Sequence, residues 1–293
     1  MSLSGLWIGA TLALAALLSV WIVRWGRRAR DKSRLVCTCG YLPDPPTRSS
    51  LRWMRVVARL VVWIQIGRVR TTGLANIESA EPKIILPTHG HYLDPFVLAH
   101  LLPEGARIMA AHGLLRFGGG LGALLFSKWG AFCTDLDEGK GIPALRAAVR
   151  ILVSGQTLVM FPEGWAHMDG AVGPFRQGAA GIARMAEAKL HRPVAVVPVY
   201  LRYGRYPGPW INRFSTTFQC LILFAGIIFF RRGVCVSVGK PVLSCELSKD
   251  NTLATETLRR AVLDLGESPG VPLNRNPRGR ESSSISNEIE KLR

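Results

Sequence analysis

Short strand-like runs alternate with helical stretches between residues 83 and 200, and this alternation constrains the fold more than any other feature of the sequence. Five runs have the length and apolar content of strands: Lys83–Leu86, Arg107–Ala111, Gly130–Thr134, Thr157–Phe161 and Val194–Tyr200. Helical patterns between them are clearest at Ile142–Val153 and Gln177–Lys189. The alternation predicts an α/β fold with a mixed, largely parallel sheet flanked by helices. Because ligands in such sheets collect at the carboxyl ends of strands, functional residues are expected there.

The C-terminal third continues the pattern less regularly. Gly233–Gly239 predicts another strand, and Asn251–Leu265 predicts another helix. The apolar run Phe218–Phe230 is too short to span a membrane comfortably, so we expect it to be buried or interfacial. Residues 267–293 are rich in Pro, Ser, Asn and Arg, which predicts a disordered tail.

The N-terminal segment Leu3–Val23 is apolar or small throughout and carries no charge. At about 1.5 Å per residue it is long enough to cross a bilayer core of about 30 Å. Six basic residues follow it: Arg24, Arg27, Arg28, Arg30, Lys32 and Arg34. By the positive-inside rule, residues 1–34 are expected to form a single-pass transmembrane anchor with the rest of the chain on the cytoplasmic side. A cleaved signal peptide is the alternative, but no basic residue precedes the apolar run.

Residues 35–69 are expected to form a proline-rich linker followed by an amphipathic helix at Leu51–Ile66. Basic residues recur at spacings of four, three and four, which is helical periodicity: Arg48, Arg52, Arg55 and Arg59. The remaining surface is broadly apolar and includes Trp53 and Trp63. This pattern fits a helix at the membrane interface and also a core helix with a solvated Arg face. Residues 70–266 then form the α/β domain.

The formal net charge of +17 suits polyanionic partners such as nucleic acid, anionic lipid or phosphate-bearing substrates. The charge is strongest beside the predicted anchor and in the tail, and no nucleic-acid-binding motif is present, so no nucleic-acid partner is expected. Cys37 and Cys39 lack the second pair that a zinc site requires, and no metal site is predicted.

The strongest local motif for chemistry is the segment that runs from Thr88 to Pro95 after the strand at Lys83–Leu86. His89 and Asp94 are five residues apart, about 500° on a continuous helix, so they can meet only if the segment turns. Gly90 permits a turn, while Asp94 followed by Pro95 predicts a helix start with Asp94 as the N-cap. A carboxylate beside a neutral imidazole is suited to general base catalysis. The alternative is a capping Asp next to an unrelated loop histidine, and His91 is a second candidate for part of the role of His89.

A second motif, Phe161-Pro162-Glu163-Gly164, ends another predicted strand and can present a carboxylate and backbone amides to a ligand. Further along, Arg176 stands just before the helix predicted at Gln177–Lys189. A cation beside a helix N-terminus favours an anion. Each of these pieces, taken alone, is also compatible with an ordinary turn.

In order, the motifs His-x-x-x-x-Asp, Phe-Pro-Glu-Gly, Phe-Arg-x-Gly and Val-Pro-Val resemble those of the glycerolipid acyltransferases of the lysophosphatidate (1-acylglycerol-3-phosphate) acyltransferase type. The last two lie at Phe175–Gly178 and Val197–Val199, and the resemblance extends over residues 70–240. It implies that His89 is the general base and Asp94 its partner. It also implies a set of substrate-binding residues: Phe161, Pro162, Glu163, Gly164, Arg176, Gly178, Val197 and Pro198.

The resemblance implies a membrane enzyme of phospholipid biosynthesis that uses no cofactor. Its co-substrate is an acyl-CoA or acyl carrier protein thioester, its acceptor is a lysolipid, and its setting is the lipid bilayer. The family usually carries an Arg at the position of Leu136, where it is thought to contact the acceptor phosphate. Arg176, Lys140 or Lys128 can replace that cation, or the acceptor lacks that phosphate. A membrane-surface lipid-binding homologue without activity is the remaining alternative.

Overall fold

The computed structural model describes residues 3–38, 40–78, 82–102, 105–134, 141–214, 218 and 233–267, without the side chains of residues 3–18, 117–119, 209 and 212. Two predictions lie outside these residues: the structure of the apolar run after Phe218 and that of the tail beyond Glu267.

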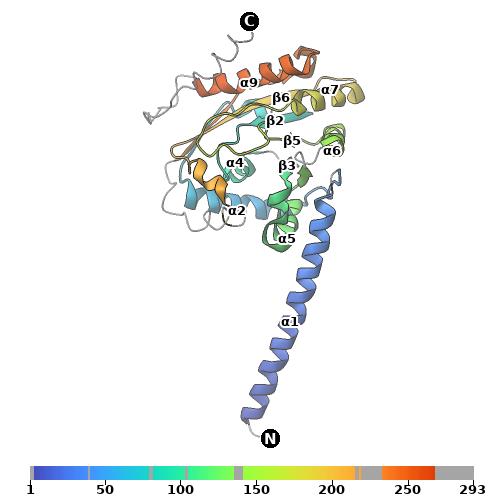
Figure 1. Ribbon diagram of the computed structural model, residues 1–293, viewed down its shortest axis with the longest axis vertical. Helices are drawn as coiled ribbons and strands as arrows, with labels where there is room; N and C mark the ends of the chain where they lie inside the picture. Colours follow the sequence, from blue (N-terminus) through green and yellow to red (C-terminus); the bar gives the residue numbers. More distant parts are fainter. Residues whose placement is uncertain are drawn as a thin grey trace.

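An eight-stranded sheet forms the centre of the protein (Figure 1). Along the sheet the strands are β1 (Val69–Thr72), β7 (Val234–Val238), β6 (Ala195–Tyr203), β2 (Lys83–Pro87), β5 (Leu158–Val159), β3 (Arg107–Ala111) and β4 (Ala131–Thr134), and β8 (Val242–Leu243) pairs with β6. Among the strand pairs of the described residues, only β6–β7 and β6–β8 are antiparallel. The prediction of a mixed, largely parallel sheet is confirmed.

Strand β2 shows why this chain forms such a sheet. All five of its residues are buried, with Ile84 and Leu86 on one face and Ile85 on the other. Ile84, Ile85 and Leu86 form a continuous apolar run, which is typical of a central strand that is covered on both faces. β2 pairs in parallel with β5 on one side and β6 on the other, so the carboxyl ends of all three strands lie at one edge of the sheet.

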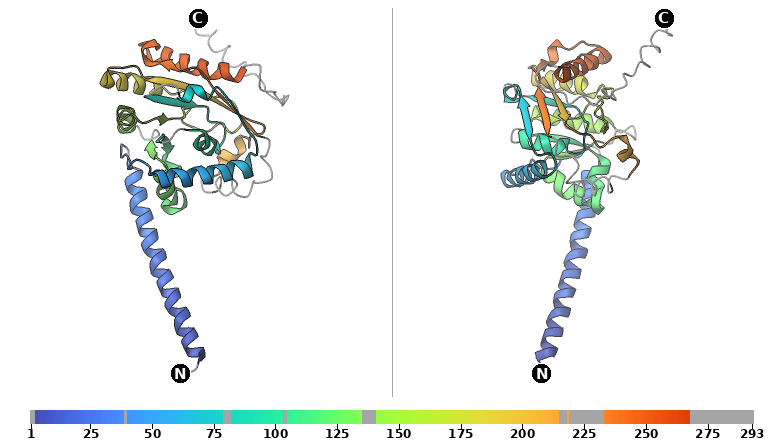
Figure 2. Two further views of the ribbon diagram at one scale, coloured as in Figure 1. Left: turned by 180° about the vertical axis from the view of Figure 1, so that it is seen from behind. Right: turned by 90° about the vertical axis from the view of Figure 1, so that its left-hand side faces the viewer.

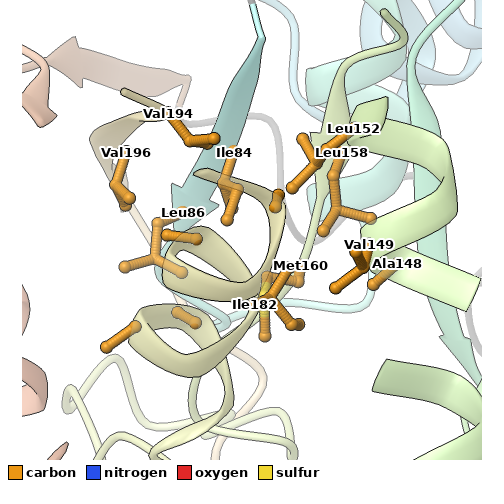
Figure 3. Close-up of a cluster of buried hydrophobic side chains, with 14 of the residues drawn as sticks. Ile84, Leu86, Ala148, Val149, Leu152, Leu158, Met160, Ile182, Val194 and Val196 are labelled. Carbon is orange, nitrogen blue, oxygen red and sulfur yellow. The ribbon is translucent and has the colours of Figure 1, made fainter. Parts of the chain in front are cut away.

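Helices cover both faces of the sheet (Figures 1 and 2). One layer consists of α6 (Gly141–Val153), α7 (Gly178–Leu190) and α9 (Asn251–Glu267), and the other contains α2 (Arg48–Gln65) and α4 (Asp94–Leu101). The shorter elements are α3 (Ala75–Glu78) and the 3-10 turns η1 (Pro209–Arg213) and η3 (Ser244–Glu246). Under α6 and α7 the core is a dense aliphatic cluster that includes Ile84, Leu152, Leu158 and Ile182 (Figure 3).

The N-terminal segment forms one long helix, α1 (Leu3–Val36), whose C-terminal part contacts α5 (His112–Lys128) and which extends away from the sheet layers (Figure 1). Within the part of the chain that the structure describes, we find no helix that combines the length and the apolar character needed to cross a membrane. The predicted transmembrane anchor is therefore not confirmed. In the second half of α1, where side chains are described, the basic residues from Arg24 to Arg34 interrupt the apolar sequence.

Two arginines, Arg107 buried and Arg150 exposed, hold the linker between α1 and α2 against the domain. The guanidinium of Arg107 is fully buried and donates to the carbonyl of Pro43 at 2.5 Å. That of Arg150 donates to the carbonyl of Gly40 at 2.6 Å. Thr47 then caps α2 by accepting a hydrogen bond from the backbone N–H of Ser50.

We expect Leu152→Ala to lower the free energy of unfolding by about 2–5 kcal/mol, because it removes a fully buried side chain from the core under α6 and leaves a cavity. Leu253→Ala is the matched control, since Leu253 is 61% exposed and its truncation should change that free energy by less than about 0.5 kcal/mol. Urea unfolding followed by circular dichroism measures both. Equal losses in the two variants would contradict the assignment of this core.

Candidate active site

Three parallel strands deliver the residues of the site to one edge of the sheet. β2 leads into His89, β5 leads into Glu163, and β6 ends at Tyr203. Thr88 ties two of these ends together, because its hydroxyl accepts a hydrogen bond from the backbone N–H of Leu201 at 3.0 Å. The predicted position of the site, at the carboxyl ends of strands, agrees with this arrangement.

His89 and Asp94 do meet. The Nδ1 atom of His89 lies 2.8 Å from Oδ2 of Asp94, whose side chain is fully buried, while the His89 side chain is 20% exposed. A carboxylate only accepts hydrogen bonds, so Nδ1 carries the proton and Nε2 is left as the basic nitrogen. The ring of Phe161 stacks on the imidazole with centroids 4.1 Å apart, which restricts its orientation. The pair therefore has the geometry that general base catalysis requires.

Asp94 does not cap α4, and that part of the prediction was wrong. Leu93 is the N-cap residue, and no side chain accepts a hydrogen bond there. The Asp94 carboxylate instead accepts from His89 and from the backbone N–H of His91 at 3.0 Å through Oδ2, and from the hydroxyl of Tyr203 at 2.6 Å through Oδ1. These three hydrogen bonds satisfy the buried carboxylate, so it does not accept from the N–H groups at the start of α4.

The loop after β5 holds the backbone of His89 on both sides. The buried carboxylate of Glu163 accepts from the N–H of His89 at 2.7 Å and from the N–H of Gly173 at 2.8 Å. The N–H of His167 donates to the carbonyl of His89 at 2.7 Å. Burial raises the pKa of Glu163 above its ordinary value, and the two backbone donors partly oppose that shift. Glu163 thus joins two loops of the site.

Two glycines of the site lie close to neighbouring side chains. A Cβ atom at Gly90 would lie 3.1 Å from the ring of Tyr206, which packs against the turn after His89. Gly164 has φ +71°, and a Cβ atom there would lie 2.5 Å from Nε of Arg176. The exposed Arg176 side chain consequently lies across Gly164, one residue from Glu163.

His91 is unsuited to share the role of His89. It is fully buried, its Nδ1 accepts a hydrogen bond from the N–H of Leu93 at 3.1 Å, and its ring stacks on Tyr203 with centroids 4.5 Å apart. Burial lowers the pKa of His91 to about 4, although Asp94 acts in the opposite direction. The ring is therefore a neutral structural part of the turn at neutral pH.

The structure brings only part of the predicted substrate set to His89. Phe161, Glu163, Gly164 and Arg176 gather there, and the carbonyl of Pro162 accepts a hydrogen bond from the N–H of Arg176 at 2.8 Å. The remaining members lie away from the imidazole. Gly178 begins α7, while Val197 and Pro198 are buried in β6 beside β2, so their substrate contacts stay predictions.

The cations suggested as replacements for the missing Arg differ in position. Arg176 lies in the site, whereas Lys128 ends α5 just before β4 begins, at the opposite edge of the sheet. Leu136 and Lys140 lie outside the described residues. No group of three or more His, Cys, Asp or Glu side chains able to hold a metal ion occurs among the residues that are described.

Sequence reasoning missed Tyr203 and Tyr206. The predicted strand stopped at Tyr200, but β6 continues to Tyr203. Had the strand been predicted to reach Tyr203, this tyrosine would have been placed at the carboxyl end of β6, next to β2. That position would have identified it as a candidate for the site.

Comparison with known proteins identifies the class. Residues 68–202 match the model of the family described as Acyltransferase, and the predicted resemblance to the lysophosphatidate acyltransferases is confirmed. The chain is 24% identical over 154 residues to a 1-acyl-sn-glycerol-3-phosphate acyltransferase of Borreliella burgdorferi, a match that covers 53% of this chain and 59% of that protein.

Among solved structures, the fold is similar to that of the 1-acyl-sn-glycerophosphate (LPA) acyltransferase PlsC from Thermotoga maritima. The TM-score is 0.52 at 19% sequence identity, and the match covers 89% of this chain and 96% of that one. At this identity the likeness concerns the fold.

We expect His91 to make folding pH-dependent. Because burial lowers its pKa from 6.5 to about 4, the unfolded chain takes up a proton that the folded protein excludes. This contribution to stability is fully present above pH 6.5 and is lost as the pH falls towards 4, by up to about 3 kcal/mol.

His91→Asn is the matched variant, since its amide oxygen can still accept from the N–H of Leu93 but does not titrate in this range. Urea unfolding between pH 7 and pH 4 should show a shallower pH dependence for the variant. Identical slopes for both proteins would contradict the assignment.

Proposed function

We propose that this protein is an O-acyltransferase that moves a fatty acyl chain from a thioester, acyl-CoA or acyl carrier protein, to the hydroxyl of a lysophospholipid-type acceptor. The observation that carries the proposal is the His89–Asp94 pair, joined at 2.8 Å at the carboxyl edge of the sheet. The family of residues 68–202 and the name of the Borreliella relative support 1-acylglycerol-3-phosphate as the acceptor.

In the proposed reaction, Nε2 of His89 accepts the proton of the acceptor hydroxyl while that oxygen attacks the thioester carbonyl. The C–O bond of the new ester forms, the C–S bond breaks, and the imidazolium returns the proton to the departing thiolate. Asp94 holds the proton on Nδ1 and stabilises the positive charge that develops on the ring. Phe161 limits rotation of the imidazole by stacking on it.

Arg176 is the residue we propose for the acceptor phosphate. It is exposed, it lies across Gly164, and it precedes α7, whose N-terminus adds a partial positive charge. The family's usual Arg is Leu136 here, so an acceptor without that phosphate is the second candidate.

We further propose that α2 contacts the surface of a lipid bilayer. Its side chains Leu51, Ala58 and Val62 are buried, while Trp53, Val56, Leu60 and Trp63 are 52–69% exposed. The spacing of three, four and three places these four on one face of the helix. Arg52 and Arg59 are exposed beside them and suit anionic headgroups. α2 lies on the side of the molecule from which α1 extends (Figures 1 and 2).

His89→Ala is expected to lower the rate of acyl transfer by about 10²–10⁴-fold, because it removes the general base. The assay uses labelled acyl-CoA and acyl carrier protein with lysophosphatidate, glycerol 3-phosphate and uncharged or zwitterionic lysolipids. Transfer to lysophosphatidate that Arg176→Ala weakens would support the phosphate site. Transfer only to an uncharged or zwitterionic lysolipid would replace that acceptor by the second candidate. If no donor and acceptor pair gives His89-dependent product, the enzymatic proposal fails and a lipid-binding role replaces it.

The double variant Trp53→Ala and Trp63→Ala is expected to weaken binding to vesicles that contain anionic lipid at least about tenfold, because it removes two large apolar contacts. Flotation on a density gradient measures the bound fraction. Leu253→Ala is the control, since Leu253 is exposed on α9, in the opposite layer. Unchanged flotation of the double variant would rule out α2 as the contact.

A further inference from the structure

Both oxygens of the Asp94 carboxylate are engaged, and they are engaged from different parts of the fold. Oδ2 accepts hydrogen bonds from Nδ1 of His89 and from the backbone N–H of His91, both in the turn after β2. Oδ1 accepts a hydrogen bond of 2.6 Å from the hydroxyl of Tyr203, the last residue of β6, which is 109 positions further along the chain. The turn supplies the contacts of one oxygen, and the sheet supplies the contact of the other.

We propose that Tyr203 is a positioning residue for the acyl transfer reaction: its hydroxyl fixes the plane of the Asp94 carboxylate so that Oδ2 stays aligned with Nδ1 of His89. The inference rests on the function proposed above. The terminal torsion of an Asp side chain is broad and roughly two-fold, and rotation about it moves both carboxylate oxygens. The two donors on Oδ2 oppose this rotation, and the hydrogen bond on Oδ1 narrows the remaining range from the other side.

Tyr203 is itself held rigidly. Its side chain is buried, its ring stacks on His91, and Tyr206 meets it edge-on with centroids 5.7 Å apart. The Tyr203 backbone N–H donates to the hydroxyl of Tyr206 at 3.2 Å. Burial, followed by the charge of Asp94, raises the pKa of Tyr203 well above its ordinary value, so the hydroxyl remains protonated and continues to donate.

The position of Tyr203 in the sheet explains how it acts at a distance from the reacting atoms. β6 pairs with β2 over Lys83–Pro87, and Thr88 continues the contact through its hydroxyl bond to Leu201. The strand that carries Tyr203 is therefore in fixed register with the strand that carries His89. A donor on a strand is held in place more precisely than a donor on a loop would be, so Tyr203 can fix the position of the Asp94 carboxylate.

Tyr203→Phe removes only the hydroxyl, and we expect it to lower kcat about 10-fold while KM stays within about twofold, because the variant loses one hydrogen bond to a charged group and no substrate contact. Tyr200→Phe is the matched control. Tyr200 lies on the same strand but faces α9, where its ring contacts Gly266 and Arg202, and its kcat should match that of the wild type within about twofold.

A second comparison separates positioning from a general effect on folding. In an Asp94→Ala background both acceptor oxygens are gone, and adding Tyr203→Phe should change kcat by less than about twofold. Circular dichroism at the assay temperature checks that each variant is folded. A folded Tyr203→Phe protein with unchanged kcat, a change confined to KM, or equal losses in both backgrounds would each overturn the proposal.

Failure of this inference is distinguishable from failure of the proposed function. If wild type transfers acyl groups, His89→Ala does not, and Tyr203→Phe equals wild type, only the role of Tyr203 is rejected. If wild type shows no His89-dependent transfer with any donor and acceptor, the function is rejected and the role of Tyr203 falls with it.

Discussion

The fully buried carboxylate of Asp94 is the constraint on which the site depends. A buried acidic group destabilises the fold unless donors surround it, and here the donors are the imidazole of His89, the backbone N–H of His91 and the hydroxyl of Tyr203. These donors can reach the Asp94 carboxylate only if the chain after β2 turns back on itself and β6 ends nearby. The same contacts orient the basic nitrogen of His89, so the stability of this turn and its chemistry have one cause.

A second buried carboxylate, that of Glu163, stabilises the other side of the same turn. Its two oxygens accept from the backbone of His89 and of Gly173, and His167 donates back to the carbonyl of His89. The Phe-Pro-Glu-Gly motif was predicted to bind substrate. In the structure its carboxylate holds the two loops together, while Phe161 stacks on the imidazole and Arg176 lies across Gly164.

Most of the sheet could be predicted from the sequence, because central parallel strands are continuous apolar runs and the amphipathic helices between them have clear periodicity. β3 matches its prediction residue for residue, and β2, β4, α6 and α7 match within one residue at either end. β5 is shorter than predicted, because Phe161 leaves the strand to stack on His89. β1, β8 and α5 were not predicted; β8 has only two residues and α5 is rich in glycine, which weakens a local signal.

The sequence by itself determined the α/β class, the edge at which chemistry would occur and the candidate pair His89 and Asp94, because these follow from local periodicity and from the motifs between the strands. Tertiary structure decided that the pair meets, that Asp94 serves the imidazole instead of capping α4, and that Tyr203 completes its shell of donors. It also decided which face of α2 is buried. The physical reason is that desolvation and hydrogen-bond partners depend on residues far apart in the chain, such as Asp94 and Tyr203, whose distance only the packed sheet sets.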